Sequence, residues 1–260
     1  MQGHSILINS ENRSSGSSSD FTYEIQGSNS DYTHCIVLGC NIPVSYYLVS
    51  PPNNTFVLTE GLTSVTIEVH AGNYNVNSWQ DTITTLLNDS SPNNWTYTVS
   101  FFNDYTSQSN GLYTFHCTQG NPTISFPLNS EIYPRFGMLF NSSNTFVSNT
   151  LVSTNVVNFI AESVLRLSSN LVEDGDLLTI FSDNSAPYQN ISYQCQTDLY
   201  AKRLANKAKD STIKIRLLDK HGNVLDLNGQ NILINLLIYK PDEMSANISN
   251  YIKYKLLTNQ

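Results

Sequence analysis

Short runs in which apolar and polar residues alternate recur along this chain and are separated by turn-forming residues. In 64–69 (SVTIEV) and 212–217 (TIKIRL), every second side chain is apolar. A strand with this period of two buries one face and leaves the other in solvent. Many such strands at short spacing predict an all-β sandwich or barrel of antiparallel strands. The strands are expected near 5–9, 20–26, 33–42, 55–59, 64–70, 95–102, 112–118, 124–126, 156–168, 177–182, 191–196, 211–219 and 232–240.

Helix signals are few and lie in the connections. A first helix is predicted to begin at Asn77 or Ser78, which can cap it, and to run through Asn88. Its apolar residues Trp79, Ile83, Leu86 and Leu87 fall on one stripe. A second helix is predicted from Thr197-Asp198 through Lys207, with one apolar and one basic side. A third is expected within 241–260.

The length of 260 residues allows one large all-β domain or two small ones. We favour one domain over 1–240, with an insertion around 120–155 and a separate C-terminal tail at 241–260. The alternative is two domains with a break around 141–150. Residues 11–19 are rich in serine and are expected to form a flexible loop.

Charge is sparse and unevenly distributed. Charged residues make up 13% of the chain, against roughly 25% in typical soluble domains. Residues 1–200 contain three basic and sixteen acidic residues, a net of −13, whereas 201–260 contain ten basic and five acidic residues, a net of +5. An acidic body with a basic C-terminal part predicts a polarised molecule, with one face suited to acidic subunits or to nucleic acid.

The basic residues of the C-terminal part form the candidate interaction site. Lys214 and Arg216 are two apart on one predicted strand and therefore share a face. Contact with nucleic acid would be made through phosphates, without sequence preference. No aromatic residues alternate with the basic ones to stack on bases, so a protein partner is favoured over nucleic acid. The candidate cluster consists of Lys202, Arg203, Lys207, Lys209, Lys214 and Arg216.

No catalytic motif is found in the sequence, and we expect neither an enzyme nor a bound cofactor. The acidic turn at 173–176, together with Asp183, has the oxygen ligands that calcium prefers but lacks an EF-hand spacing. An acid-bearing hairpin turn is the favoured interpretation, and calcium remains the alternative. The four cysteines lack C-x-x-C spacing and are expected to be free thiols in the core. Cys35 and Cys40 are five apart, which predicts opposite faces of one strand.

The N-terminus lacks a basic stretch followed by a long apolar core, so no secretory signal is expected. The best apolar run, 232–239, is strand-sized, well short of the ~20 residues that cross a bilayer. No membrane-spanning segment is therefore expected.

An ordered series of segments resembles the penton (minor capsid) proteins of virophages, Polinton-like viruses and related eukaryotic DNA viruses. The series spans roughly residues 5–240, and its order and spacing carry the resemblance more than any single segment. Its members are the opening from ILINS at 6–10 to FTYEI at 21–25, the stretch 36–47 with an Ile-Pro corner at 42–43, TFVLTE at 55–60, VTI at 65–67, GNY at 72–74, SEIYPRFGM at 130–138 and LDLNG at 225–229.

The resemblance implies a jelly-roll antiparallel β-sandwich that forms homopentamers at the fivefold vertices of an icosahedral capsid. It further implies a place in the virion, assembly inside the host cell and contact with the major capsid protein at its flanks, without catalytic residues. The alternative function is a β-sandwich carbohydrate- or receptor-binding module. Such a module would be expected to present an exposed Trp or Tyr, whereas both Trp79 and Trp95 are predicted to lie in the core.

Overall fold

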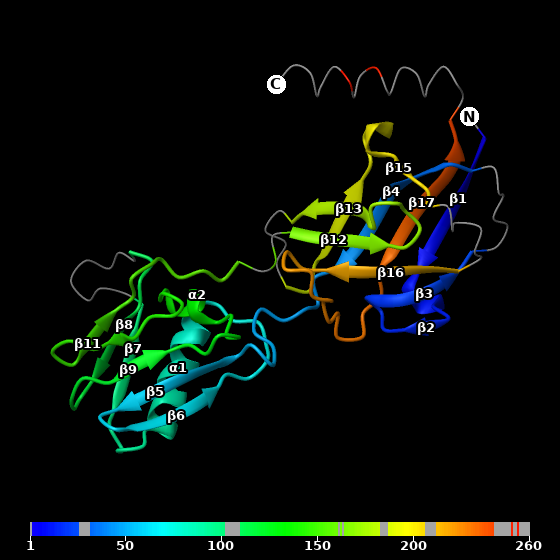
Figure 1. The fold of residues 1–260 in the computed structure, drawn as a ribbon. Coiled ribbons are helices and arrows are strands. Elements are labelled where there is room, and N and C mark those ends of the chain that lie inside the picture. The colour runs from blue at the N-terminus through cyan, green and yellow to red at the C-terminus, as the bar shows by residue number, and fades with distance from the viewer. Residues whose placement is uncertain are drawn as a thin grey trace. The chain divides into compact units, whose positions relative to one another are not determined.

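A computed structural model describes residues 2–25, 32–101, 110–160, 162, 164–182, 187–205, 212–241, 251 and 254. Antiparallel strands dominate it, which confirms the predicted all-β class (Figure 1). The strands are β1 (Gln2–Asn9), β2 (Ser15–Gly16), β3 (Asp20–Glu24), β4 (His34–Pro43), β5 (Thr55–Glu60), β6 (Thr63–Glu68), β7 (Tyr97–Ser100), β8 (Thr114–Cys117), β9 (Thr123–Ser125), β10 (Asn144–Thr145), β11 (Thr150–Val152), β12 (Val164–Ser169), β13 (Asp176–Phe181), β14 (Asn190–Gln194), β15 (Lys202–Arg203), β16 (Thr212–Leu218) and β17 (Leu233–Lys240). The helices are α1 (Val76–Ser90) and α2 (Tyr133–Phe136), with 3-10 turns η1 (Ser10–Asn12) and η2 (Asp198–Tyr200).

The chain divides into two compact units. Unit 1 combines Met1–Tyr46 with Glu162–Gln260, and unit 2 is the continuous stretch Tyr47–Ala161. The insertion suggested by the sequence, around 120–155, lies inside unit 2, whose bounds are wider. Most of the predicted tail at 241–260 lies outside the described residues, and the two residues described where a helix was expected, Tyr251 and Tyr254, are both helical.

Unit 1 is a sandwich of two sheets. One sheet has the order β1-β17-β4-β14, with β15 also paired to β4, and the other has the order β13-β12-β16-β3-β2. In the described part of unit 1, eight strands are longer than two residues, and they can be numbered one to eight along the chain. The first sheet then has the order one, eight, three, six, and the second has the order five, four, seven, two. This is the strand order of a jelly roll. Unit 2 is inserted in the chain between its third strand, β4, and its fourth, β12.

The core of unit 1 comes from the inward side chains of these alternating strands. Ile213, Ile215 and Leu217 of β16 are buried, while Lys214 and Arg216 between them are exposed. This pattern confirms the two-residue period seen in the sequence.

A bulge in β4 alters the faces predicted for its cysteines. The register with β17 shifts between Asn235 and Leu236, and β4 takes the extra residue, Leu38. Cys35 consequently lies opposite Ile238, and Cys40 opposite Ile234. Those two isoleucines are four apart and share a face of β17, so the prediction of opposite faces for the cysteines was wrong. Cys35, Cys40 and Cys117 are buried free thiols, and Cys195 is half-buried.

Unit 2 contains two small sheets, β10-β9-β5-β6 and β11-β8-β7, and helix α1, which packs against β6 and β7. The helix is capped by Asn75, two or three residues before the predicted caps, because the Asn75 side chain accepts hydrogen bonds from the backbone N–H groups of Asn77 and Ser78, both at 3.0 Å. Trp79, Ile83 and Leu87 are buried and Leu86 is partly buried, which confirms the predicted apolar stripe.

An aromatic cluster forms the centre of unit 2. The buried ring of Phe136, presented by the short helix α2, lies 5.0 Å from Phe56, 5.3 Å from Trp79 and 5.3 Å from Phe126, measured between ring centroids. Phe136 therefore joins β5, α1 and the segment after β9 in one core.

The Ser-rich segment expected to be a flexible loop is paired instead. β2 pairs with β3, and Ser17 N donates to Asp20 O at 2.8 Å. The Arg13 guanidinium donates to the backbone oxygens of Ser10 and Gly16. A single arginine thus donates to backbone carbonyls three residues before it and three residues after it, which the serine-rich composition did not reveal.

Candidate functional site

The candidate basic cluster falls on different parts of unit 1. Lys202 and Arg203 form β15 at the margin of the first sheet, whereas Lys214 and Arg216 lie on β16 in the second sheet. Lys207 and Lys209 lie outside the described residues. The cluster that is compact in the sequence is therefore spread over both sheets in the part of the chain that the structure describes.

β15 lies within the helix predicted from Thr197-Asp198 through Lys207, of which only the 3-10 turn η2 is helical in the described residues. Backbone N–H groups just after β15 donate hydrogen bonds to residues next to strands of both sheets. Leu204 N donates to Thr33 O, just before β4, at 3.0 Å, and Ala205 N donates to Leu171 O, just after β12, at 2.8 Å. Pairing with two separate neighbours outweighs the weak local preference for a helix. β15 thereby closes one corner of the sandwich.

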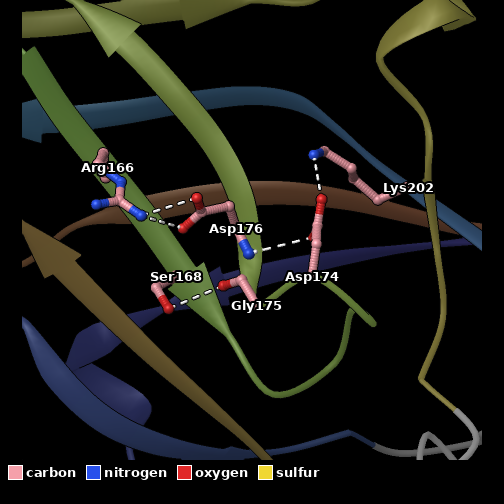
Figure 2. Close-up of polar contacts among 6 residues, drawn as sticks. All are labelled: Arg166, Ser168, Asp174, Gly175, Asp176 and Lys202. Carbon is pink, nitrogen blue, oxygen red and sulfur yellow. Dashed lines mark hydrogen bonds and ion pairs between the residues drawn. The ribbon is translucent and has the colours of Figure 1, made fainter.

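Two ion pairs are found at this corner (Figure 2). Lys202 Nζ lies 2.7 Å from Asp174 Oδ2, and Arg166 Nη2 lies 2.7 and 2.8 Å from the two carboxylate oxygens of Asp176. The turn between β12 and β13 is further held by Ser168, whose hydroxyl donates to Gly175 O at 2.8 Å. The acidic turn is therefore a charged hairpin turn with basic partners from β12 and β15.

The electrostatics of the corner follow from these pairs. The hydrogen bond from Lys202 holds the pKa of Asp174 below its ordinary value. Burial raises the pKa of the Cys35 thiol to about 12, and the nearby negative charge of Asp174 adds to the effect. Cys35 therefore remains protonated at neutral pH and is a poor nucleophile.

The same pairs bear on the calcium alternative. Asp174 and Asp176 direct their carboxylates to Lys202 and Arg166, and Asp183 lies outside the described residues. Across the described ranges, no group of three or more His, Cys, Asp or Glu side chains is arranged to hold a metal ion.

The second half of the cluster lies on the outer face of β16. Lys214 Nζ is 3.1 Å from Asp20 Oδ1 on the adjacent β3. Arg216 is exposed and lies opposite Asp20 and Ser168 in the strand register. The prediction that Lys214 and Arg216 share a strand face is confirmed. Both Lys202 and Lys214 have acidic partners in their own chain, and among the described residues no ion pair is found for Arg203 or Arg216.

Sequence reasoning noted the acidic turn but did not find Arg166 as its partner. The only available signal was the rarity of basic residues before 201, where Arg166 is one of three. A cation retained in so acidic a stretch is a reasonable candidate for an internal ion pair.

Unit 2 presents no exposed tryptophan. Trp79 has no exposed surface, and Trp95 is partly buried against the core of the unit, close to Gly120. Trp79 is therefore a core residue, as predicted, whereas Trp95 is only partly buried. Exposed aromatic side chains in unit 1 include those of Tyr188 at 80% and Tyr200 at 64%. Among the described residues, no helix is both long and apolar enough to span a bilayer.

The fold defines this chain as an all-β jelly-roll protein with a second unit inserted between the third and fourth strands. Its fold is similar to that of the mavirus penton protein in a crystal structure, with a TM-score of 0.49 and 12% sequence identity over 92% of this chain and 99% of that chain. No family profile and no curated protein matches the sequence.

Proposed function

We propose that this chain is a minor capsid protein of the penton type, whose copies form homopentamers at the fivefold vertices of an icosahedral virus shell. The single observation that carries the proposal is the jelly-roll strand order of unit 1. Jelly rolls are recurrent in viral capsids, although lectins and cupins also use them. The sequence resemblance to pentons is what favours a capsid role over these other uses of the fold.

The segments that resemble pentons fall at defined places in both units. The Ile-Pro corner ends β4, the 55–60 segment is β5, and the 130–138 segment contains α2 with the core residue Phe136. The 225–229 segment forms the turn before β17. The resemblance therefore lies in elements that shape each unit, which supports a penton-like architecture over the whole chain.

The composition also suits a subunit of a larger assembly. Few charges mean that a flank can be buried against a neighbour without the large cost of removing ions from water. Closed fivefold symmetry needs a heterologous contact, in which one side of a copy meets a different side of the next. We propose that the flanks of unit 1 make this contact and that the major capsid protein packs outside the ring.

The decisive experiment is to determine the mass of the purified chain by native mass spectrometry and its shape by electron microscopy. The proposal expects a species of five chains with fivefold averages. A monomer at all concentrations that also stays out of particles when co-expressed with the major capsid protein would refute it. A glycan array tests the alternative, since sugar binding by a monomer would favour the carbohydrate-binding function.

A further inference from the structure

The outer strands of the first sheet of unit 1 are β1 on one side and β14 on the other. β1 runs for eight residues without a register shift against β17. Strands at the edge of a sheet usually carry charges, prolines or bulges that prevent pairing with another chain. β1 has the sequence QGHSILIN and β14 the sequence NISYQ, so neither contains proline or any Asp, Glu, Lys or Arg.

The outer strands of the second sheet differ in this respect. β13 begins with Asp176, which is paired with Arg166. On the opposite side, β3 carries Asp20 and Glu24 and is further covered by β2. Charged side chains and a covering strand, which hinder strand addition, are thus present on the second sheet, while β1 and β14 on the first sheet contain neither proline nor any Asp, Glu, Lys or Arg.

The backbone of β1 has hydrogen-bonding groups directed away from the sheet. Ser10 N, at its end, donates to Ile232 O at 3.0 Å, and antiparallel residues alternate between bonded and non-bonded pairs. Gly3, Ser5 and Leu7 therefore direct their N–H and C=O groups outward. The outward oxygen of Leu7 is reached by the Tyr23 hydroxyl at 3.4 Å, whereas no backbone partner for Gly3 or Ser5 is found on this side within the described residues.

β14 has the same property on the other side of the sheet. Cys195 N donates to Leu38 O at 2.8 Å, which places the odd residues of this segment against β4. Ser192, at the middle of β14, therefore directs its backbone groups outward, and its side chain is exposed.

We propose that β1 of one copy pairs with β14 of the next copy, so that the first sheet continues from chain to chain around the ring. The occupant of the β1 edge is thus a second copy of this chain. This inference rests on the proposed function and specifies which strands form its subunit contact.

The direction of the strands supports this pairing. β1, β17, β4 and β14 alternate in direction, since each pair is antiparallel. Placing β14 of a second copy beside β1 therefore preserves the antiparallel alternation when the two copies are related by rotation about an axis along the strands. Because β1 and β14 are different surfaces, the contact is heterologous, as a closed ring requires.

Proline and lysine substitutions on β1 test the edge. Ser5→Pro removes an outward N–H that unit 1 does not use, while Ser5→Ala loses the same hydroxyl bond to Asn235 and retains the N–H. Leu7→Lys places a charge on a side chain that is 65% exposed, and Leu62→Lys is its control on the tip of the β5–β6 hairpin, at 105% exposed. Ser5→Pro and Leu7→Lys should raise the concentration for half-assembly by roughly tenfold or more.

The two control variants should assemble as the parent chain does. Circular dichroism and the melting temperature should be the same for all four variants, which separates an assembly defect from misfolding. Pentamers of normal affinity from folded Ser5→Pro and Leu7→Lys chains would overturn the β1 contact while leaving the proposed function intact. A parent chain that never oligomerises would overturn both.

A disulfide test identifies the partner strand and does not depend on the loss of assembly. The double variant Ser5→Cys/Ser192→Cys should give, on oxidation, a ladder of linked chains that ends at five, because paired strands bring such side chains within disulfide range. Neither single variant should form the ladder. Dimers from Ser5→Cys alone would show that β1 pairs with itself and would overturn the proposed β1–β14 contact.

Discussion

The Tyr97 hydroxyl donates a 2.7 Å hydrogen bond to a carboxylate oxygen of Glu60, and the Glu60 side chain has no exposed surface. The same carboxylate accepts hydrogen bonds from the Ser91 hydroxyl at 2.7 Å and from Asn93 N at 2.9 Å. Burial, followed by the bond to Glu60, raises the pKa of Tyr97. In the part of unit 2 that the structure describes, this acid is balanced by neutral donors, since no ion pair to it is found. The network ties the β5–β6 hairpin to the segment after α1.

Tyr97→Phe should lower the free energy of unfolding by about 2 kcal/mol, because it removes a buried hydrogen bond to a charged group. Urea denaturation monitored by near-UV circular dichroism measures the change. Tyr188→Phe, at a tyrosine that is 80% exposed, is the control and should have almost no effect. Equal stability of the Tyr97 and Tyr188 variants would mean that the network does not stabilise unit 2.

Gly137 and Gly61 form a matched pair of glycines in the left-handed region, with φ of 64° and 62°. A methyl group at Gly61 meets nothing within 4 Å, while one at Gly137 would overlap the backbone oxygen of Asn155. Gly61→Ala should therefore lower the free energy of unfolding by about 1 kcal/mol, which is the conformational penalty alone. Gly137→Ala should cost about 3 kcal/mol or more, because the backbone must also move. Thermal melts of the two variants test the difference, and equal losses would contradict it.

Alkaline pH should destabilise unit 1 through its buried thiols. Burial raises the pKa of Cys35 and of Cys40 to about 12, from the ordinary value of 9.0. Between these values the unfolded chain has lost protons that the folded chain retains, so stability is complete below pH 9 and falls as the pH rises toward 12. The slope is up to about 1.4 kcal/mol per pH unit for each thiol.

The measurement is the urea midpoint at several values between pH 8 and 11. The double variant Cys35→Ala/Cys40→Ala should show a flatter decline than the parent chain, although it starts from a lower stability because of the lost packing. Cys195→Ala, at a half-buried thiol, is the control. An unchanged slope in the double variant would exclude the two thiols as the cause.

The proposed contact between the basic cluster and an acidic neighbour can be tested at the two arginines for which the described residues show no ion pair. Arg203→Glu/Arg216→Glu should reduce the yield of particles assembled with the major capsid protein, while the melting temperature of the isolated chain changes by no more than a few degrees. Lys240→Glu, an exposed cation at the end of β17, is the control. Parent-like particle yields at physiological salt would end this proposal.

Much of the fold could be predicted from local patterns. The alternation in 212–217 identified β16 and the exposed face of Lys214 and Arg216, because a two-residue period has one physical interpretation in an extended chain. The stripe containing Trp79 and Ile83 identified α1. The short strands, such as β2 and β15, had no such signal, since two residues are too few to show a period.

The candidate site was predicted less well. Neighbouring basic residues in the sequence suggested one cluster, but Lys202 and Lys214 are on different sheets and have different acidic partners, Asp174 and Asp20. Ion pairs between residues 28 or more apart depend on which strands meet, and no local pattern contains that information.

By itself, the sequence determined the strand-rich class, the buried and exposed faces of the regular strands and the uneven distribution of charge, because each depends on the spacing of residue types along the chain. The tertiary structure decided the order of the strands in the sheets, the division into two units, the common face of Cys35 and Cys40 and the partners of the acidic turn. These depend on contacts between distant segments, where one inserted residue in β4 reverses a face and backbone pairing of 203–205 replaces a helix.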